Sequence, residues 1–160
     1  MLPASTYKNR GLAKKRLGDL RGSIIDYNEA IRLNSDCADS YYYRGVSKKE
    51  MGEISSAVED FNTAISLDSK NSGAYYSRGS AKNDLGEYLD AIADYTEVIN
   101  INPHIAKAYL LRGTIKNNAL GDKHGSLIDL QKAAQLFQKQ GDLVMYRKTR
   151  ENIMILEGLL

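Results

Sequence analysis

The sequence has 160 residues, of which 42% are hydrophobic and 26% are charged, and its 22 basic and 20 acidic residues give a net charge of +2. This composition is typical of a globular protein, and the balanced charge indicates neither a nucleic acid nor a membrane surface as partner. No apolar run is long enough for a transmembrane helix or a signal peptide, and the single Cys37 excludes an internal disulfide, so we expect a cytoplasmic protein.

A pattern of 34 residues recurs four times along the chain. Each copy has an Arg-Gly dipeptide, a Tyr four residues before that Gly, a Lys three residues after it, and then a second Gly. The Arg-Gly glycines are Gly11, Gly45, Gly79 and Gly113. A strict period of this length predicts stacked repeats, here at 4–37, 38–71, 72–105 and 106–140.

Each repeat predicts two helices. The first helices, at about 6–17, 39–51, 73–85 and 107–119, are expected to end at the second Gly in the left-handed conformation. The second helices, at about 22–33, 54–67, 88–101 and 125–139, carry an amphipathic stripe. No period of two occurs, so strands are not expected. One residue is inserted in the fourth copy, and we expect an irregular turn at 120–124 there.

The two helices of a repeat should pack antiparallel, because the turn between them is short. Counting places from the first residue of each repeat, this puts the Gly at place 8 against a small residue at place 20. It also puts the Tyr at place 4 against the aromatic residue at place 24. The predicted aromatic pairs are Tyr7 with Tyr27, Tyr41 with Phe61, and Tyr75 with Tyr95.

An Arg at place 7 and an Asp at place 23 also recur in every copy. We interpret them as partly buried ion pairs that fix helix register, and a ligand-binding row of arginines is the alternative. The Lys at place 11 is expected to keep its ammonium group in water. The pairs are Arg10 with Asp26, Arg44 with Asp60, Arg78 with Asp94, and Arg112 with Asp129.

These residues resemble the tetratricopeptide repeat over about 4–139. Tyr41, Gly45, Ala57, Phe61 and Ala64 stand at its characteristic positions in the second copy, although Tyr replaces the usual Trp. The resemblance implies an all-α, right-handed superhelical α-solenoid of four helix-turn-helix repeats. It also implies that places 2, 5, 6, 9, 12 and 13 line an inner groove.

Residues 140–160 break the period and predict a capping helix at about 142–157, with Asp142 as its N-cap. We expect 1–160 to be a single domain. Met154, Leu159 and Leu160 are left over as exposed apolar residues, so a homodimer through this helix is an alternative role.

No motif for catalysis, nucleotide binding or metal binding occurs. His104 and His124 are isolated, and Cys37 has no His at a catalytic spacing, so we expect no cofactor, no metal and no enzymatic activity.

The expected groove instead suits an extended peptide, because it offers Tyr, Asn and Lys side chains. We predict a non-catalytic protein–protein interaction scaffold that binds a peptide or partner segment, with a mild preference for acidic ligands. The alternatives are a self-associating assembly unit and a regulatory domain of a larger protein. We call the eleven expected binding residues the groove row: Lys8, Leu12, Lys15, Tyr42, Tyr43, Val46, Lys49, Tyr76, Asn83, Lys107 and Asn117.

A chaperone-tail receptor is not predicted. Family members that hold a chaperone's C-terminal carboxylate use Lys and Asn in one repeat, Asn in the next, and Lys and Arg in the third. Lys8 fits the first position, but Leu12, Tyr43, Gly73 and Ser77 occupy the others.

Overall fold

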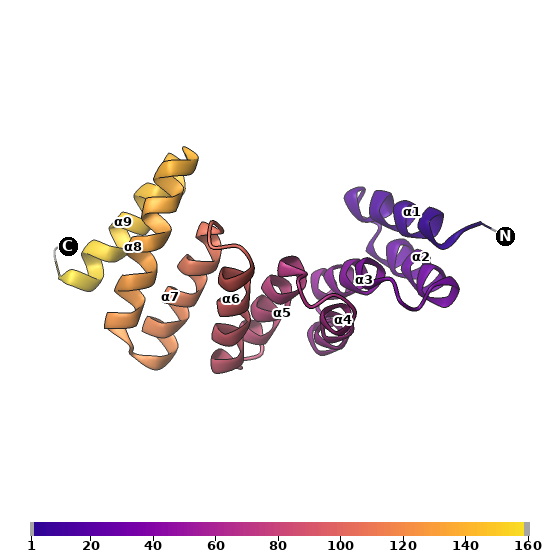
Figure 1. Cartoon of the computed structure of the whole chain (residues 1–160), viewed down its shortest axis with the longest axis horizontal. Coiled ribbons are helices and arrows are strands. Elements are labelled where there is room, and N and C mark those ends of the chain that lie inside the picture. Colours follow the sequence, from indigo (N-terminus) through magenta and orange to yellow (C-terminus); the bar gives the residue numbers. More distant parts are fainter. Residues whose placement is uncertain (1, 159–160) are drawn as a thin grey trace. The chain divides into compact units, whose positions relative to one another are not determined.

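The computed structural model describes residues 2–158, which form nine α-helices and no strand (Figure 1). This confirms the expected all-α helical-repeat fold. The helices are α1 (Ala4–Arg16), α2 (Leu20–Leu33), α3 (Ala38–Glu50), α4 (Ile54–Leu67), α5 (Ser72–Asp84), α6 (Tyr88–Ile101), α7 (Ala106–Leu120), α8 (Lys123–Gln140) and α9 (Leu143–Glu157).

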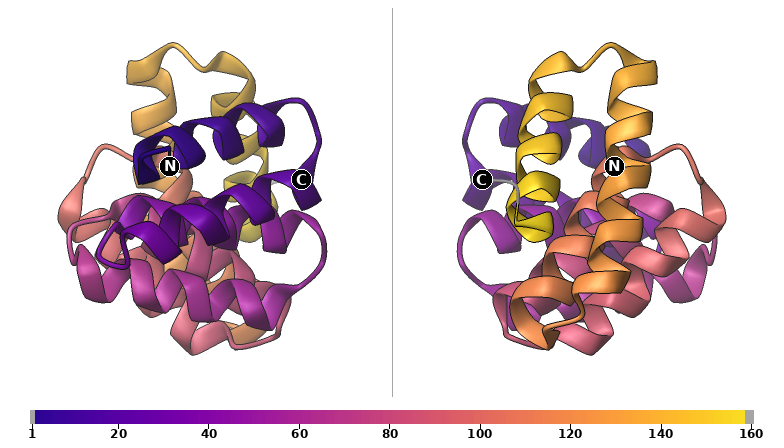
Figure 2. Two further views of the ribbon diagram at one scale, coloured as in Figure 1. Left: turned by 90° about the vertical axis from the view of Figure 1, so that its right-hand side faces the viewer. Right: turned by 90° about the vertical axis from the view of Figure 1, so that its left-hand side faces the viewer.

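The chain forms two compact units, Met1–Leu85 and Gly86–Leu160. In the first unit, α1 pairs with α2 and α3 pairs with α4. In addition, α3 packs on α2, and α5 packs on α4. In the second unit, α7 pairs with α8, α6 packs on α7, and α9 packs along α8 (Figure 2, right).

The turns within the hairpins have the expected left-handed glycines. Gly18 and Gly52 have φ values of +83° and +84°, which an L side chain rarely adopts. After the first of these turns the Asp19 carboxylate accepts a hydrogen bond of 2.8 Å from the Gly22 amide. This cap begins α2 at Leu20, two residues earlier than predicted.

The fourth hairpin is more regular than expected. The inserted residue lengthens α7 to Leu120, so the turn consists only of Gly121 and Asp122. Gly121 takes the left-handed conformation, and the Asp122 side chain caps α8 by accepting from the Gly125 amide. The prediction of an irregular turn at 120–124 was wrong, because a helix can absorb one more residue before its C-cap.

The aromatic residue at place 24 packs on the Gly at place 8 rather than on the Tyr at place 4. A Cβ atom on Gly45 would lie 2.7 Å from Phe61 Cε1 and 3.2 Å from the Ala57 carbonyl oxygen. The small-residue contact was therefore predicted correctly for this pair. Gly11 meets the Tyr27 ring in the same way, at 2.8 Å. Only a residue without a side chain allows this approach.

The tyrosines at place 4 have a different neighbour from the predicted one. The Arg44 guanidinium lies 5.4 Å from the centre of the Tyr41 ring, and Arg10 lies 5.1 Å from that of Tyr7. Places 4 and 7 are three residues apart and share one helix face, so this cation–π contact competes with the cross-helix pairing. The predicted pairs of Tyr7 with Tyr27 and of Tyr41 with Phe61 were wrong.

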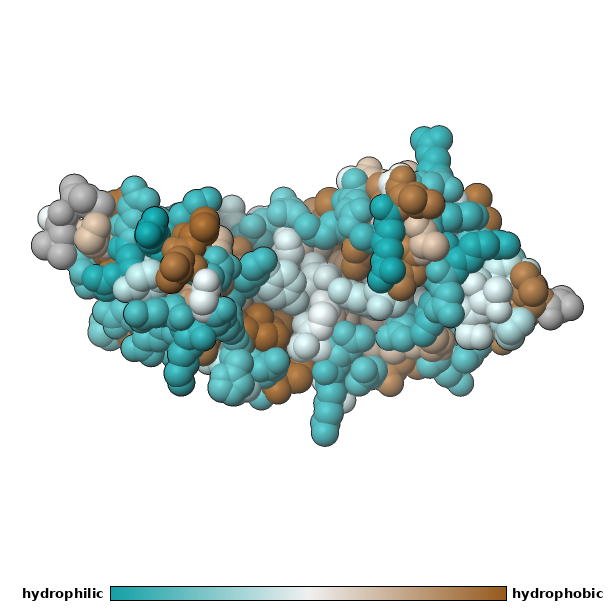
Figure 3. All heavy atoms as spheres, turned by 90° about the horizontal axis from the view of Figure 1, so that it is seen from above, coloured by the Kyte–Doolittle hydropathy of each residue, from teal (hydrophilic) through white to brown (hydrophobic). Residues whose placement is uncertain are grey.

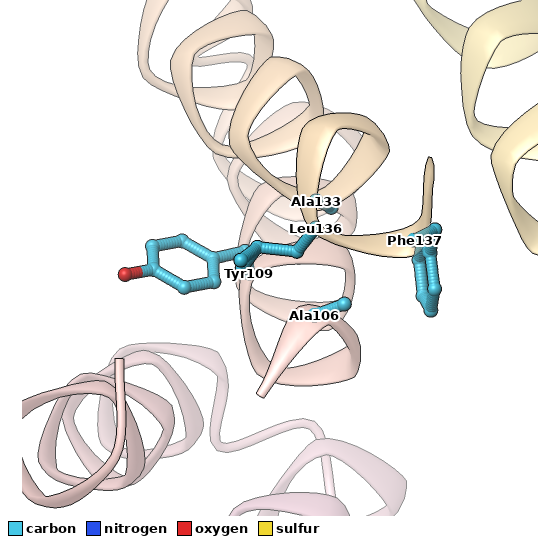
Figure 4. Close-up of a cluster of buried hydrophobic side chains, with 5 residues drawn as sticks. All are labelled: Ala106, Tyr109, Ala133, Leu136 and Phe137. Carbon is cyan, nitrogen blue, oxygen red and sulfur yellow. The ribbon is translucent and has the colours of Figure 1, made fainter. Parts of the chain in front are cut away.

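The core of the second unit lies between α7, α8 and α9. Ala106 and Tyr109 of α7 and Ala133, Leu136 and Phe137 of α8 form one buried cluster (Figure 4). A neighbouring cluster joins Leu130 and Ala134 of α8 to Ile153 of α9. The helix at 143–157 thus covers the last hairpin, as expected of a cap. Leu159 and Leu160 lie outside the described residues, and Met154 is half-buried.

We predict that Gly45→Ala lowers the free energy of unfolding by about 1–3 kcal/mol, because the new methyl group overlaps the Phe61 ring. Urea denaturation measures this loss, and adding Phe61→Leu should recover part of it. Gly73→Ala is the control, since its methyl group would lie 3.3 Å from the movable Tyr42 hydroxyl group. Equal stability of Gly45→Ala and the native protein would contradict the close packing.

Candidate functional site

In three hairpins, α1–α2, α3–α4 and α7–α8, a buried aspartate joins the two helices through a bidentate ion pair. Arg44 donates from Nε and Nη2 to the two carboxylate oxygens of Asp60, at 2.9 and 2.6 Å. Arg10 binds Asp26 in the same way, and Arg112 binds Asp129. The predicted ion pairs are therefore confirmed for these three copies. Because each of these three guanidinium groups is already bound by two oxygens of a buried aspartate, a ligand-binding row of arginines is not favoured.

The lysine at place 11 completes each of these ion pairs, contrary to the expectation that its ammonium group stays in water. Lys48 Nζ lies 2.9 Å from Asp60 Oδ2, and Lys116 Nζ lies 2.8 Å from Asp129 Oδ2. Places 7 and 11 are one helical turn apart, so both cations reach the same carboxylate. Each buried aspartate is thus held between two cations.

The arginine also links each repeat to the one before it. Arg44 Nη1 donates to Asn28 of α2 at 2.8 Å, and Arg78 Nη1 donates to Asn62 of α4 at 2.7 Å. In the second unit, Arg112 Nη1 donates to the Thr96 hydroxyl group of α6 at 2.9 Å. These bonds fix the register between neighbouring hairpins within each unit.

The lysines of the groove row in the first unit are paired with carboxylates of the following repeat. Lys8 bonds to Asp39 at 2.8 Å, and this hydrogen bond raises the pKa of Lys8. The other pairs are Lys15 with Glu50 at 2.7 Å and Lys49 with Asp84 at 2.9 Å. The positive charge of these three lysines is therefore balanced within the unit.

Tyr42 and Tyr43 are half-buried and belong to an aromatic cluster, whereas we expected them to be exposed. The Tyr43 ring stacks on the Tyr27 ring, with 6.1 Å between the ring centres. The centres of the Tyr42 and Tyr43 rings are 5.1 Å apart, and those of the Tyr42 and Phe61 rings are 6.2 Å apart. Burial raises the pKa of Tyr27 to about 12. Tyr42 and Tyr43 thus connect the cores of the first two repeats.

A cavity of about 260 Å³ lies between α3 and α5, and we call it the unit 1 cavity. It brings Val46, Lys49 and Tyr76 of the groove row together. Burial raises the pKa of the Tyr76 hydroxyl group. The buried Phe61 side chain also lines the cavity, and the sequence analysis did not assign it to the site. The full lining is Val46, Lys49, Glu50, Phe61, Tyr76, Ser77 and Ser80.

The second unit has a smaller and more polar cavity of about 180 Å³ between α7, α8 and α9. Asn117 of the groove row lines it, while Lys107 is exposed at the start of α7. The buried Ser126 Oγ lines it too, and has no hydrogen-bond partner in the described part of the chain. Asn152, Ile155 and Leu156 of α9 were missed, because they lie beyond the periodic part of the sequence.

Leu12 and Asn83 of the groove row are half-buried and line neither cavity. A single row of eleven residues that runs through both units stays a prediction. On the face drawn in Figure 3, hydrophobic atoms form separate small groups among hydrophilic ones. A ligand on this face would therefore meet small apolar sites within a polar surface.

Among residues 2–158, no helix has both the length and the apolar composition to cross a membrane. The same residues contain no group of three or more His, Cys, Asp or Glu side chains placed to hold a metal ion.

Repeated antiparallel helix pairs with this packing define a helical-repeat protein. The family model of the tetratricopeptide repeat matches residues 4–37, 38–71 and 72–105, so the chain belongs to the tetratricopeptide repeat family. The fourth copy lies outside the matched residues, although α7 and α8 form the same kind of hairpin. No curated protein sequence matches the chain significantly.

Solved structures share the fold. MamA 41-end from Desulfovibrio magneticus RS-1 is 20% identical with a TM-score of 0.76, covering 96% of this chain and 94% of that chain. The Arabidopsis OM64 TPR domain is 27% identical with a TM-score of 0.70, covering 72% and 95%. The first TPR of Spaghetti (RPAP3), bound to the HSP90 peptide SRMEEVD, is 23% identical with a TM-score of 0.72, covering 74% and 93%.

We predict that Asp60→Ala lowers the free energy of unfolding by about 3 kcal/mol, as measured by urea denaturation. This is the lower end of the range for breaking a buried ion pair, because Arg44 and Lys48 remain 18% and 16% exposed and can reach water. Glu59→Gln removes an exposed carboxylate one residue away and should change stability by less than about 0.5 kcal/mol. Equal effects of the two substitutions would refute the role of Asp60.

The free energy of unfolding should depend on pH through Asp26. The hydrogen bond from Arg10 lowers the pKa of Asp26 in the folded protein. Its stabilising contribution is therefore present above the unfolded pKa of about 4 and is lost as the pH falls towards the folded pKa. Asp26→Asn should be less stable at pH 7 and should lose less further stability between pH 5 and pH 3 than the native protein. Parallel pH profiles of the two proteins, measured by urea denaturation, would contradict this.

Proposed function

We propose that the protein is a non-catalytic protein–protein interaction scaffold and that the unit 1 cavity binds a peptide or partner segment. The observation that carries the proposal is the cavity itself, with Phe61 and Val46 as apolar lining and Ser77 and Ser80 as polar lining. The family supports it, because the first TPR of Spaghetti (RPAP3) is a tetratricopeptide repeat domain with a bound peptide.

The size of the unit 1 cavity favours a peptide side chain over a whole cofactor. Its volume of about 260 Å³ lies below the range of about 300–1,000 Å³ that is usual for small-molecule pockets. One apolar side chain can contact Val46 in the cavity, while the serine hydroxyl groups and Tyr76 can bond to the peptide backbone. Preorganised helices keep the entropic cost of binding low.

Acidic residues of the ligand should contribute less to the binding free energy than the sequence suggested. Lys49 already pairs with Asp84, and Lys15 with Glu50. An acidic ligand would replace one carboxylate by another at a partly exposed position, where an ion pair contributes about 0–1 kcal/mol. We therefore propose an apolar anchor residue, with flanking acidic residues as a secondary preference.

The test is selection of peptides from a random displayed library against the native protein, followed by titration calorimetry. Ser77→Arg fills the unit 1 cavity and should weaken the selected peptides by about tenfold or more, which is about 1.4 kcal/mol. Ser66→Arg places the same side chain on an exposed position of α4 and should leave binding unchanged. Tyr42→Ala is unsuitable, because Tyr42 packs against Phe61.

The selected peptides would contradict the proposed site if they bound native protein and Ser77→Arg equally well. The HSP90 peptide SRMEEVD serves as a negative control, since Lys8 alone fills one of the positions of a carboxylate site here.

A further inference from the structure

The outer face of α9 carries a stripe of four exposed residues, which we call the α9 stripe: Val144, Lys148, Glu151 and Ile155. Spacings of four, three and four residues place them on one side of a helix. The opposite side holds Thr149 and Ile153, which are buried. Val144 and Ile155 are 65% and 56% exposed, and they stand at the two ends of the stripe.

The order of residues along the α9 stripe is the same from either end. From each end it runs from an apolar residue through two opposite charges to an apolar residue, with identical spacing. Lys148 and Glu151 form no ion pair with any residue of the described chain. Two copies of the stripe, placed antiparallel about a two-fold axis, are therefore complementary to each other.

We propose that the protein forms a homodimer in which α9 of one protomer packs antiparallel against α9 of its partner. Val144 then lies against the partner's Ile155, and Lys148 lies against the partner's Glu151. Because of the two-fold axis, each of these contacts occurs twice. An isologous contact of this kind needs only one surface that complements itself. A parallel arrangement would instead place like charges together, which excludes it.

The expected dimer is weak and depends on concentration. A helix of 15 residues is about 22 Å long, and a pair of such helices buries less than the roughly 1,200 Å² of a stable interface. An interface of this size is typical of weak, transient association. Salt should weaken the dimer, because two of its four contacts are exposed ion pairs.

The experiment is a charge exchange followed by sedimentation velocity over a concentration series of about 10–500 µM, because a weak dimer forms by mass action as the protomer concentration rises. Lys148→Glu leaves two negative charges in each stripe, and Glu151→Lys leaves two positive charges, so each variant alone should be monomeric. An equimolar mixture of the two variants should form heterodimers. The double variant with both substitutions should dimerise like the native protein, because the order of charges is only reversed.

Arg150→Glu is the matched control, since Arg150 is exposed on α9 but lies off the stripe, and this variant should still dimerise. Ile155 is not altered, because it also lines the cavity of the second unit. Circular dichroism melting checks that every variant folds.

A native protein that is monomeric throughout the concentration range would overturn the proposal. So would a dimer that Lys148→Glu and Glu151→Lys leave unchanged, or a failure of their mixture to associate. The inference goes beyond the proposed peptide binding and is separable from it. Ser77→Arg should still dimerise, and the α9 variants should still bind the selected peptides.

Discussion

A carboxylate without access to water needs compensating charge, and this requirement shapes every hairpin in which the contacts are described. Asp26, Asp60 and Asp129 are at most 4% exposed. Each lies on the second helix of its repeat and is held by an Arg and a Lys one turn apart on the first helix. Since an uncompensated buried charge is costly, the helices cannot slide past each other without breaking three interactions. The ion pairs thus select one register.

The arginine at place 7 also carries the register from one repeat to the next, since Arg44, Arg78 and Arg112 donate to Asn28, Asn62 and Thr96. Because α3 and α5 are both fixed in this way, the space between them is defined, and the unit 1 cavity results from it. The surface pairs of Lys15 with Glu50 and Lys49 with Asp84 follow the same step between repeats. The candidate binding site therefore depends on contacts that lie outside it.

The helices were predictable because the period of 34 residues, the glycines and the apolar stripes all agree. The Arg–Asp pairs followed from the recurrence of both residues at fixed places in every copy. The sequence did not show which of two competing contacts would form. Tyr41 packs with Arg44 on its own helix instead of with Phe61, and Lys48 reaches Asp60 instead of water. The role of Asn152 and Ile155 was also missed, since α9 has no second copy in the chain with which to compare it.

The most direct test of the register is a double-mutant cycle with Arg44→Met, Asp60→Ala and the combined variant, measured by urea denaturation. The account predicts a coupling free energy of about 1–3 kcal/mol between these two side chains, with the double variant more stable than the sum of the single losses implies. A coupling near zero would show that the pair contributes nothing specific. The register would then depend on apolar packing alone, which would contradict the central role of the buried aspartate.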